Sequence, residues 1–252
     1  MGRPRSTPSP ALSVVASRSP VVRASVAPTI TVLAGVNGAG KSSIGGAAFR
    51  MHGGDYFNPD EAARRLMAAN ARLTQSDANG RAWQHGKRLL EHAIARRLDF
   101  AFETTLGAHT IPRLLGEAAS AGFDVKAWYV GLATPELHLA RVQARVRRGG
   151  HDIPEAQIRQ RFTHSRLNLI ELLPRLAALR LYDNSAEADP AAGVEPRPVL
   201  LLHLDHGRVV GPADLSATPD WARPIVAAAL KRVDTPPAKA IPIQRSPRGG
   251  AR

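Results

Sequence analysis

The stretch Gly35-Val-Asn-Gly-Ala-Gly-Lys-Ser42 follows directly on the apolar run Ile30-Thr-Val-Leu-Ala34. Glycines free backbone N–H groups to curl around oxyanions, and the N-terminus of a following helix adds positive potential. The spacing G-x-x-x-x-G-K-S meets this requirement at every fixed position. The sequence therefore predicts a strand, a phosphate-binding loop and a helix in that order, which favours an α/β fold.

The pattern gives each residue of the loop a separate role. Gly35 begins the turn out of the strand, and Gly40 lets the main chain approach the phosphates. Lys41 is expected to reach the β- and γ-phosphates, and Ser42 to hold Mg²⁺. The predicted nucleotide site comprises Gly35, Asn37, Gly38, Ala39, Gly40, Lys41, Ser42 and Ser43.

The composition bounds the class of protein. A chain of 252 residues is long enough for one sizeable α/β domain. The absence of cysteine excludes disulfides, thiolate metal sites and cysteine nucleophiles, and it fits a reducing cytoplasm. No apolar stretch approaches the roughly 18 to 20 residues that cross a bilayer, so no membrane partner is expected.

The net charge of +13 raises the question of a nucleic-acid partner. About half of the excess lies in residues 1–27 and 233–252, which are rich in Pro, Ser, Arg and Gly and show no helical or strand period. We therefore expect two disordered basic tails around one domain, residues 28–232. Because so much of the charge is in these tails, nucleic acid is the less favoured partner.

Strand and helix patterns alternate from Thr29 to about Asn184, which predicts a mostly parallel sheet with crossover helices. Strands are expected at 29–33, 55–57, 99–105, 125–132 and 179–182. Helices are expected at 41–51, from 58, at 76–97, at 112–122, at 134–148 and from 155. A hairpin over 198–210 and a closing helix over 220–232 follow.

Two acids follow strands of this sheet, where ligands of open α/β folds collect. Asp60 stands a few residues after the second strand and is the candidate base that accepts the proton of an attacking hydroxyl. An acid in the first turn of a helix is also favoured by the helix dipole alone. Glu103 ends the apolar run Phe100-Ala-Phe102, where a carboxylate needs a cation or hydrogen-bond donors, and Mg²⁺ or a substrate hydroxyl is expected to supply them.

Arginines recur along two consecutive predicted helices. Arg141, Arg145 and Arg148 line one face of the first helix, and Arg159, Arg161 and Arg166 are spread around the second. Gly149-Gly150 separates the two helices. This pattern predicts a hinged lid that brings positive charge over the γ-phosphate, although a solvated basic helix face has the same pattern.

Two absent motifs narrow the class further. The strand that ends in Glu103 lacks the aliphatic run followed by Asp-Glu that is typical of motor ATPases, and no Asn-Lys-x-Asp guanine-reading motif occurs. Both absences disfavour a motor ATPase or a GTPase.

The segment His203-Leu-Asp-His206 contains metal-ligating residue types, but a two-residue turn explains them more simply. We therefore predict no metal other than Mg²⁺.

An ordered set of motifs over residues 28–190 resembles the zeta-toxin-type kinases. Besides the phosphate loop, the set comprises Asn58-Pro-Asp-Glu-Ala-Ala-Arg64, Phe102-Glu-Thr-Thr-Leu106, Tyr129-Val-Gly-Leu132, Arg145-Val-Arg-Arg-Gly-Gly-His-Asp-Ile-Pro154 and Leu181-Tyr-Asp-Asn-Ser185. The resemblance implies a P-loop kinase fold, a three-layer α/β sandwich with a helical arginine-bearing lid. It also implies ATP and Mg²⁺ as cofactors, a sugar nucleotide as acceptor and a small antitoxin protein as partner.

The resemblance also implies roles for single residues. Asp60 matches the catalytic base of the family, and Glu103 with Thr105 matches its substrate-side acid and threonine, with Thr104 between them. Lys41 and Ser42 match the nucleotide site, and Glu103 joins Ser42 as a metal-site candidate. The lid arginines match Arg145 and one of Arg159 or Arg161. Arg145 and Arg161 are catalytic candidates together with Asp60 and Lys41, and Arg148 and Arg159 are nucleotide-binding candidates.

These motifs do not identify the acceptor. The best-known members of the family phosphorylate the 3′-hydroxyl of UDP-N-acetylglucosamine, but this chain has Glu-Thr-Thr-Leu where they resemble Glu-Gly-Thr-Gly-Arg. An arginine is therefore missing here. A nucleotide-regulated nucleic-acid-binding protein is the alternative from another class, and a polynucleotide kinase ranks lower because no aromatic residues cluster near the lid.

Overall fold

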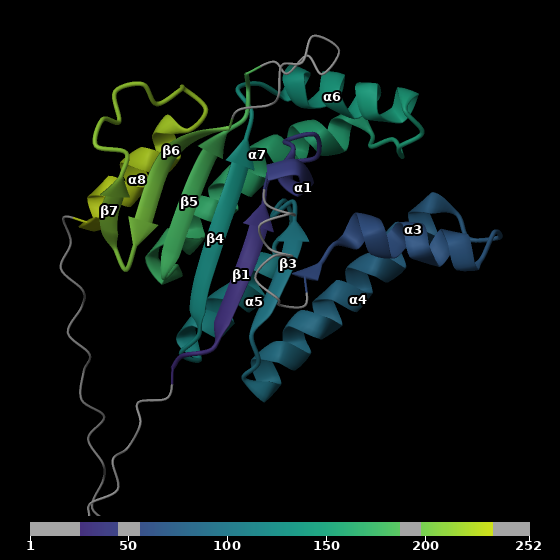
Figure 1. Ribbon diagram of the computed structural model, residues 1–252, viewed down its shortest axis with the longest axis horizontal. Coiled ribbons are helices and arrows are strands. Elements are labelled where there is room, and N and C mark those ends of the chain that lie inside the picture. The colour runs from purple at the N-terminus through teal and green to yellow at the C-terminus, as the bar shows by residue number, and fades with distance from the viewer. Residues whose placement is uncertain (1–25, 45–55, 187–197, 234–252) are drawn as a thin grey trace, which may run out of the picture.

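The computed structural model describes residues 26–44, 56–186 and 198–233. These residues contain a seven-stranded sheet of order β2-β3-β1-β4-β5-β6-β7 (Figure 1). The first five strands in this order are parallel, and β6 and β7 extend the sheet as an antiparallel hairpin. The strands are β1 (Thr29–Ala34), β2 (Tyr56–Phe57), β3 (Phe100–Thr104), β4 (Asp124–Gly131), β5 (Ala178–Asp183), β6 (Val199–Asp205) and β7 (Arg208–Gly211).

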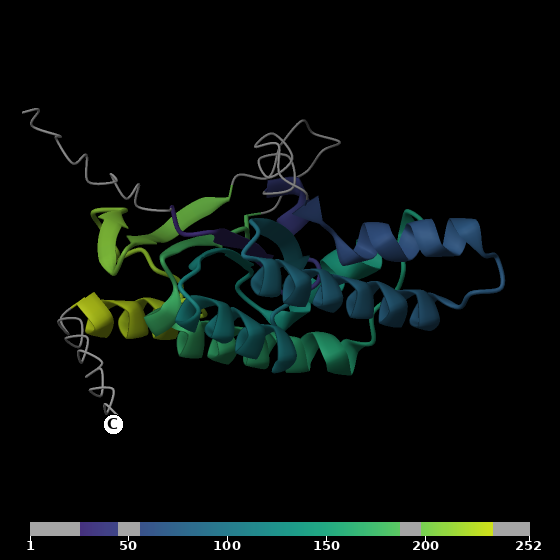
Figure 2. The same ribbon diagram turned by 90° about the horizontal axis from the view of Figure 1, so that it is seen from below.

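Helices cover one face of the sheet and extend beyond its β2 edge. In Figure 2, α4, α5, α7 and α8 lie side by side below the strands, and α3 pairs with α4. The helices are α1 (Lys41–Ile44), α3 (Pro59–Ala69), α4 (Gln75–Arg96), α5 (Thr110–Ser120), α6 (Pro135–Arg147), α7 (Glu155–Leu172) and α8 (Arg223–Val233), with a 3-10 turn η1 (Leu173–Arg175). The predicted α/β architecture with a mostly parallel sheet is confirmed.

The apolar runs of the sequence form the core. Ile30 and Val32 of β1, Phe102 of β3 and Leu179 of β5 are buried with the inner faces of α5, α7 and α8. Burial of apolar side chains in such a core is the main favourable contribution to the free energy of folding. Because β1 lies between β3 and β4, its carboxyl end is held at the centre of the sheet.

Side-chain caps begin the helices that border the site. The Asn58 side chain accepts hydrogen bonds from the backbone N–H groups of Asp60 (2.8 Å) and Glu61 (3.2 Å). The Thr134 hydroxyl accepts one from Leu137 N (3.2 Å) at the start of α6. These contacts satisfy donors that have no partner inside a helix, so the predicted starts of both helices are confirmed.

Prolines explain two predicted boundaries that were wrong. The helix predicted from Pro112 begins earlier, at Thr110, because proline fits the first turn, where N–H groups have no intrahelical partner. The closing helix begins at Arg223 rather than Asp220, with Pro224 in its first turn.

Several predictions lie outside the described residues. The phosphate-loop helix is described only as far as Ile44, so its predicted extension to residue 51 is among them. The predicted tails are also outside, except for residues 26, 27 and 233. Among the helices that are described, none has the length and apolarity needed to cross a membrane.

Candidate active site

The phosphate loop leaves β1 at the centre of the sheet in a backbone conformation that glycine permits. Gly35 has φ +142°, and its N–H donates to Thr104 O over 3.2 Å. A Cβ on Gly35 would lie 2.2 Å from Val130 O. Gly40 has φ +85°, and a Cβ there would lie 2.5 Å from Nδ2 of Asn184. Both positions require glycine, since a side chain would be strained and would clash.

Two side chains to which the sequence analysis gave no role support this loop. The Asn184 amide donates to Ala39 O over 2.9 Å, from the segment after β5. His138 of α6 is 1% exposed, and its Nδ1 lies 2.8 Å from Asn37 O. Since a carbonyl only accepts, Nδ1 carries the proton. Burial lowers the pKa of His138 to about 4, so its ring is neutral at pH 7.

Glu103 at the end of β3 joins the loop to the second strand. Its Oε1 lies 3.4 Å from Lys41 Nζ in a buried ion pair. Its Oε2 accepts hydrogen bonds from Ser42 (2.9 Å), Tyr56 (2.9 Å) and Asn58 (3.0 Å). The chain itself therefore supplies the cation and donors that a buried carboxylate needs, which were expected to come from Mg²⁺ or a substrate hydroxyl.

The Ser42–Glu103 contact fits a magnesium site. A hydroxyl and a carboxylate 2.9 Å apart offer the oxygen ligands that Mg²⁺ prefers, and this ion usually binds through one or two protein groups, waters and substrate phosphates. Within the described ranges, no group of three His, Asp or Glu side chains could hold a metal ion by itself. Ser43 also belongs to α1, but its side chain lies outside what the structure describes.

Asp60 lies in the first turn of α3 and faces the predicted lid. Its carboxylate is 43% exposed, with Oδ2 at 3.7 Å from Arg145 Nη1 and Oδ1 at 4.0 Å from His151 Nε2. These separations are ion-pair contacts rather than hydrogen bonds, so the carboxylate oxygens keep lone pairs for another donor. Asn58 links the two acids, because its Nδ2 donates to Glu103 Oε2 and its Oδ1 accepts from Asp60 N.

The two arginine-bearing helices predicted to form a lid are present as α6 and α7, and we refer to them with the loop between them as the lid. Gly149, with φ +84°, lies in the loop that separates α6 from α7. Arg161 of α7 donates from Nη1 to the Asn37 side-chain oxygen of the phosphate loop over 2.8 Å. Burial lowers the pKa of Arg161, and the Asp60 charge opposes this shift. The lid therefore contacts both the loop and the candidate base.

Two other predicted lid arginines lie elsewhere. Arg148 follows the last residue of α6 and is exposed. Arg159 donates to Glu136 and to Glu155, each over 2.7 Å. Neither arginine is among the described residues that line the cleft beside the loop. Their roles in nucleotide binding stay predictions.

A cleft of about 580 Å³ opens between the loop, β3, α4 and the lid. Thr104 and Thr105 line it, and their hydroxyls accept hydrogen bonds from Leu106 N (3.1 Å) and Gly107 N (3.4 Å). Both hydroxyls thus shape the turn after β3. The lining includes the predicted residues Asn37, Lys41, Asp60, Glu103, Thr104, Thr105 and Arg161, together with Trp83, Lys87 and His151, which were not predicted.

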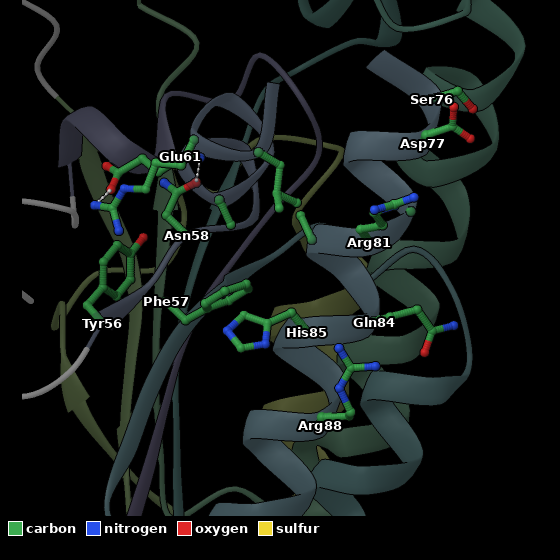
Figure 3. Close-up of a pocket in the computed structure, with 15 residues that line it drawn as sticks. Tyr56, Phe57, Asn58, Glu61, Ser76, Asp77, Arg81, Gln84, His85 and Arg88 are labelled. Carbon is green, nitrogen blue, oxygen red and sulfur yellow. Dashed lines mark hydrogen bonds and ion pairs between the residues drawn. The ribbon is translucent and has the colours of Figure 1, made fainter. Parts of the chain in front are cut away.

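A separate groove of about 920 Å³ lies between β2, α3 and α4. Figure 3 shows Phe57 and His85 pointing toward one another in this groove, with Arg81 and Arg88 along α4. The two rings are 5.6 Å apart in an edge-to-face arrangement. Phe57 lines both the groove and the cleft, so its ring is a shared wall.

The chain is similar to a known protein family and to a protein of known sequence. The AAA domain family matches residues 30–165, which run from β1 through the loop, Asp60 and Glu103 into α7. An uncharacterized protein of Haemophilus influenzae (strain ATCC 51907 / DSM 11121 / KW20 / Rd) is 33% identical over 129 residues, which is 51% of this chain and 88% of that protein.

Solved structures share the fold at low sequence identity. One chain of the AvrRxo1-ORF1:AvrRxo1-ORF2 complex with ATP has a TM-score of 0.58 and 16% identity, over 80% of this chain and 63% of that one. The present chain thus spans less than two thirds of that relative. A chain from the PezAT chromosomal toxin–antitoxin system of Streptococcus pneumoniae has a TM-score of 0.50 and 15% identity, over 84% and 88%. The chain belongs to the AAA domain family and has a P-loop kinase-like fold.

Proposed function

We propose that this protein is an ATP-dependent kinase that transfers the γ-phosphoryl group to a hydroxyl of a small molecule. The observation that carries the proposal is the convergence of Lys41, Asp60 and Arg161 on one cleft next to the phosphate loop. Phosphoryl transfer requires positioning, charge neutralisation and a carboxylate that accepts the hydroxyl proton. This cleft offers a group for each requirement.

The phosphate loop and Lys41 bind the phosphates of ATP. Ser42 and Glu103 would hold Mg²⁺, which neutralises charge on the β- and γ-phosphate oxygens when bound. Arg161, tied to the loop through Asn37, adds fixed positive charge where the transition state spreads negative charge. Arg145 adds a second positive charge beside the candidate base, with its Nη1 at 3.7 Å from Asp60 Oδ2.

Asp60 accepts the proton of the attacking hydroxyl. Its carboxylate is partly exposed and lines the cleft, and neither the Arg145 guanidinium nor the His151 imidazole is within hydrogen-bond distance of it. A hydroxyl in the cleft can therefore donate to Asp60 while its oxygen attacks the γ-phosphorus. The proton passes to the carboxylate as the new P–O bond forms and the bond to ADP breaks.

UDP-N-acetylglucosamine is the first acceptor to test, because of the resemblance to zeta-toxin-type kinases. Support for ATP and for a small protein partner comes from two similar folds, one crystallised with ATP and one from a toxin–antitoxin system. We extend the proposal to a small antitoxin-like protein as a candidate partner.

The test is ADP release by the pure protein with ATP, Mg²⁺ and UDP-N-acetylglucosamine, with the product followed by phosphorus NMR. A new phosphomonoester signal supports the proposal, and the Lys41→Ala variant is the matched negative control. The proposal fails if neither this acceptor nor a panel of sugars, nucleosides and other small alcohols increases ADP release above that in water alone. Salt-sensitive RNA or DNA binding that disappears with residues 1–27 and 233–252 would favour the nucleic-acid alternative.

A further inference from the structure

The loop between the lid helices brings one more titratable group to the candidate base. His151 follows Gly150, and its side chain is only 14% exposed. Its Nε2 lies 4.0 Å from Asp60 Oδ1, while Arg145 Nη1 lies 3.7 Å from Oδ2 of the same carboxylate. Each oxygen of Asp60 therefore faces a different lid side chain.

Arg145 also fixes the position of His151. Its Nη2 donates to His151 O over 3.0 Å, and its backbone carbonyl accepts from Gly150 N over 3.0 Å. A Cβ on Gly150 would lie 2.6 Å from Cγ of Arg145, so this turn closes tightly around the arginine side chain. The turn and the arginine together position the His151 imidazole beside Asp60.

We propose that His151 controls access to Asp60: it leaves the carboxylate available when neutral and pairs with it when protonated. The catalytic part of this inference rests on the proposed function. A neutral imidazole leaves Asp60 able to accept a proton from the acceptor hydroxyl. A protonated imidazole forms an ion pair with Asp60 and competes with that hydroxyl for the carboxylate.

The charged groups around His151 determine the pH at which the change occurs. Burial is the largest effect and lowers the pKa of His151 from its usual 6.5. The charges of Asp60 in α3 and of Asp152, the residue after His151, raise the pKa of His151. Those of Arg145 in α6 and Arg64 in α3 lower it. The neutral, permissive form is therefore the one present at pH 7, and the protonated form appears only in acid.

The first test is the pH dependence of kcat for ADP release with UDP-N-acetylglucosamine as acceptor. His151→Gln retains a side-chain N–H donor but cannot titrate, so we expect the acid limb to move to lower pH, with the KM for ATP within about twofold of wild type. His92→Gln, an exposed substitution on α4, is the matched control and should not move the limb. An acid limb that is the same in His151→Gln and wild type overturns the proposal.

The second test does not depend on turnover. Titration of the His151 imidazole by NMR should give a lower pKa in Asp60→Asn than in wild type, because the neighbouring negative charge is removed. An unchanged titration overturns the proposed contact. A lower pKa in a protein that phosphorylates no acceptor supports the contact and counts against the proposed function alone.

Discussion

The side-chain amide of Asn184 donates to the main-chain carbonyl of Ala39 over 2.9 Å, and this contact ties the end of β5 to the phosphate loop. The two residues are 145 positions apart in the sequence. Asn184 is 3% exposed, and its backbone N–H also donates to Gly131 O over 3.0 Å. The loop is thus held by the segment that follows β5, which is itself hydrogen-bonded to the end of β4, as well as by its own strand β1.

Asn184→Ala should weaken ATP binding and stability together. The substitution leaves the buried Ala39 carbonyl without its donor, which costs about 1 to 3 kcal/mol. Urea unfolding and ATP titration calorimetry measure the two effects. Asn70→Ala, at an exposed helix end, is the control and should leave ATP affinity unchanged. Equal ATP affinity in Asn184→Ala and wild type would remove the support role of this residue.

Substitutions of Lys41 and Glu103 should compensate each other in stability but not in activity. Lys41→Met leaves Glu103 buried with hydrogen bonds but without its cation, so we expect a loss of about 2 to 4 kcal/mol in the free energy of unfolding. Adding Glu103→Gln removes the uncompensated charge and should recover much of this loss. ADP release should stay abolished in the double variant. A double-mutant cycle by urea unfolding checks the coupling, and simple additivity would contradict it.

Asp60→Asn should reduce kcat by roughly 10² to 10⁴ with little change in ATP affinity, because it removes the proton acceptor and keeps the shape of the side chain. Steady-state kinetics and ATP titration calorimetry separate the two quantities. Glu61→Gln alters the neighbouring acid in the same first turn of α3 and is the control for the helix dipole. A similar kcat for both variants would exclude Asp60 as the base.

Two glycines of α4 should respond to the same substitution with opposite sign. A Cβ on Gly80 meets nothing within 4 Å among the described residues, so Gly80→Ala should stabilise the protein by about 0.5 to 1 kcal/mol. A Cβ on Gly86 would lie 2.4 Å from the Phe57 ring, so Gly86→Ala should destabilise it by about 1 to 3 kcal/mol. Thermal unfolding of both variants distinguishes these effects, and a higher Tm for Gly86→Ala would contradict the packing of α4 on β2.

His138 should make stability fall in acid. Its pKa is about 4 in the folded protein and near 6.5 in the unfolded chain, so the unfolded chain binds the extra proton first. Stability from this group is complete above pH 6.5 and is lost as the pH falls toward 4, by up to about 3 kcal/mol. Urea unfolding at pH 7 and pH 4.5 measures the loss, which should be smaller in His138→Gln. An equal loss in the variant would assign the acid sensitivity to other groups.

Much of the local structure follows from short-range sequence signals. The G-x-x-x-x-G-K-S spacing predicted the loop, and the side-chain cap at Asn58 and the glycine break at Gly149 marked where helices start or stop. These signals act within a few residues, because caps and positive φ angles depend on adjacent backbone groups. For the same reason, first-turn prolines shifted two helix starts by only a few positions.

The sequence by itself determined that a phosphate loop, an acid after β2, an acid at the end of β3 and two arginine-bearing helices exist. Only the tertiary structure decided that Glu103 pairs with Lys41 and Ser42, and that His138, His151 and Asn184 approach the loop or the candidate base. His151 and Asn184 lie inside motifs of the resemblance and His138 lies in none, and no local pattern indicated what any of the three contacts. Their partners lie about 90 to 145 positions away and become neighbours only when the parallel strands order themselves as β3-β1-β4-β5 and bring their carboxyl ends to one edge.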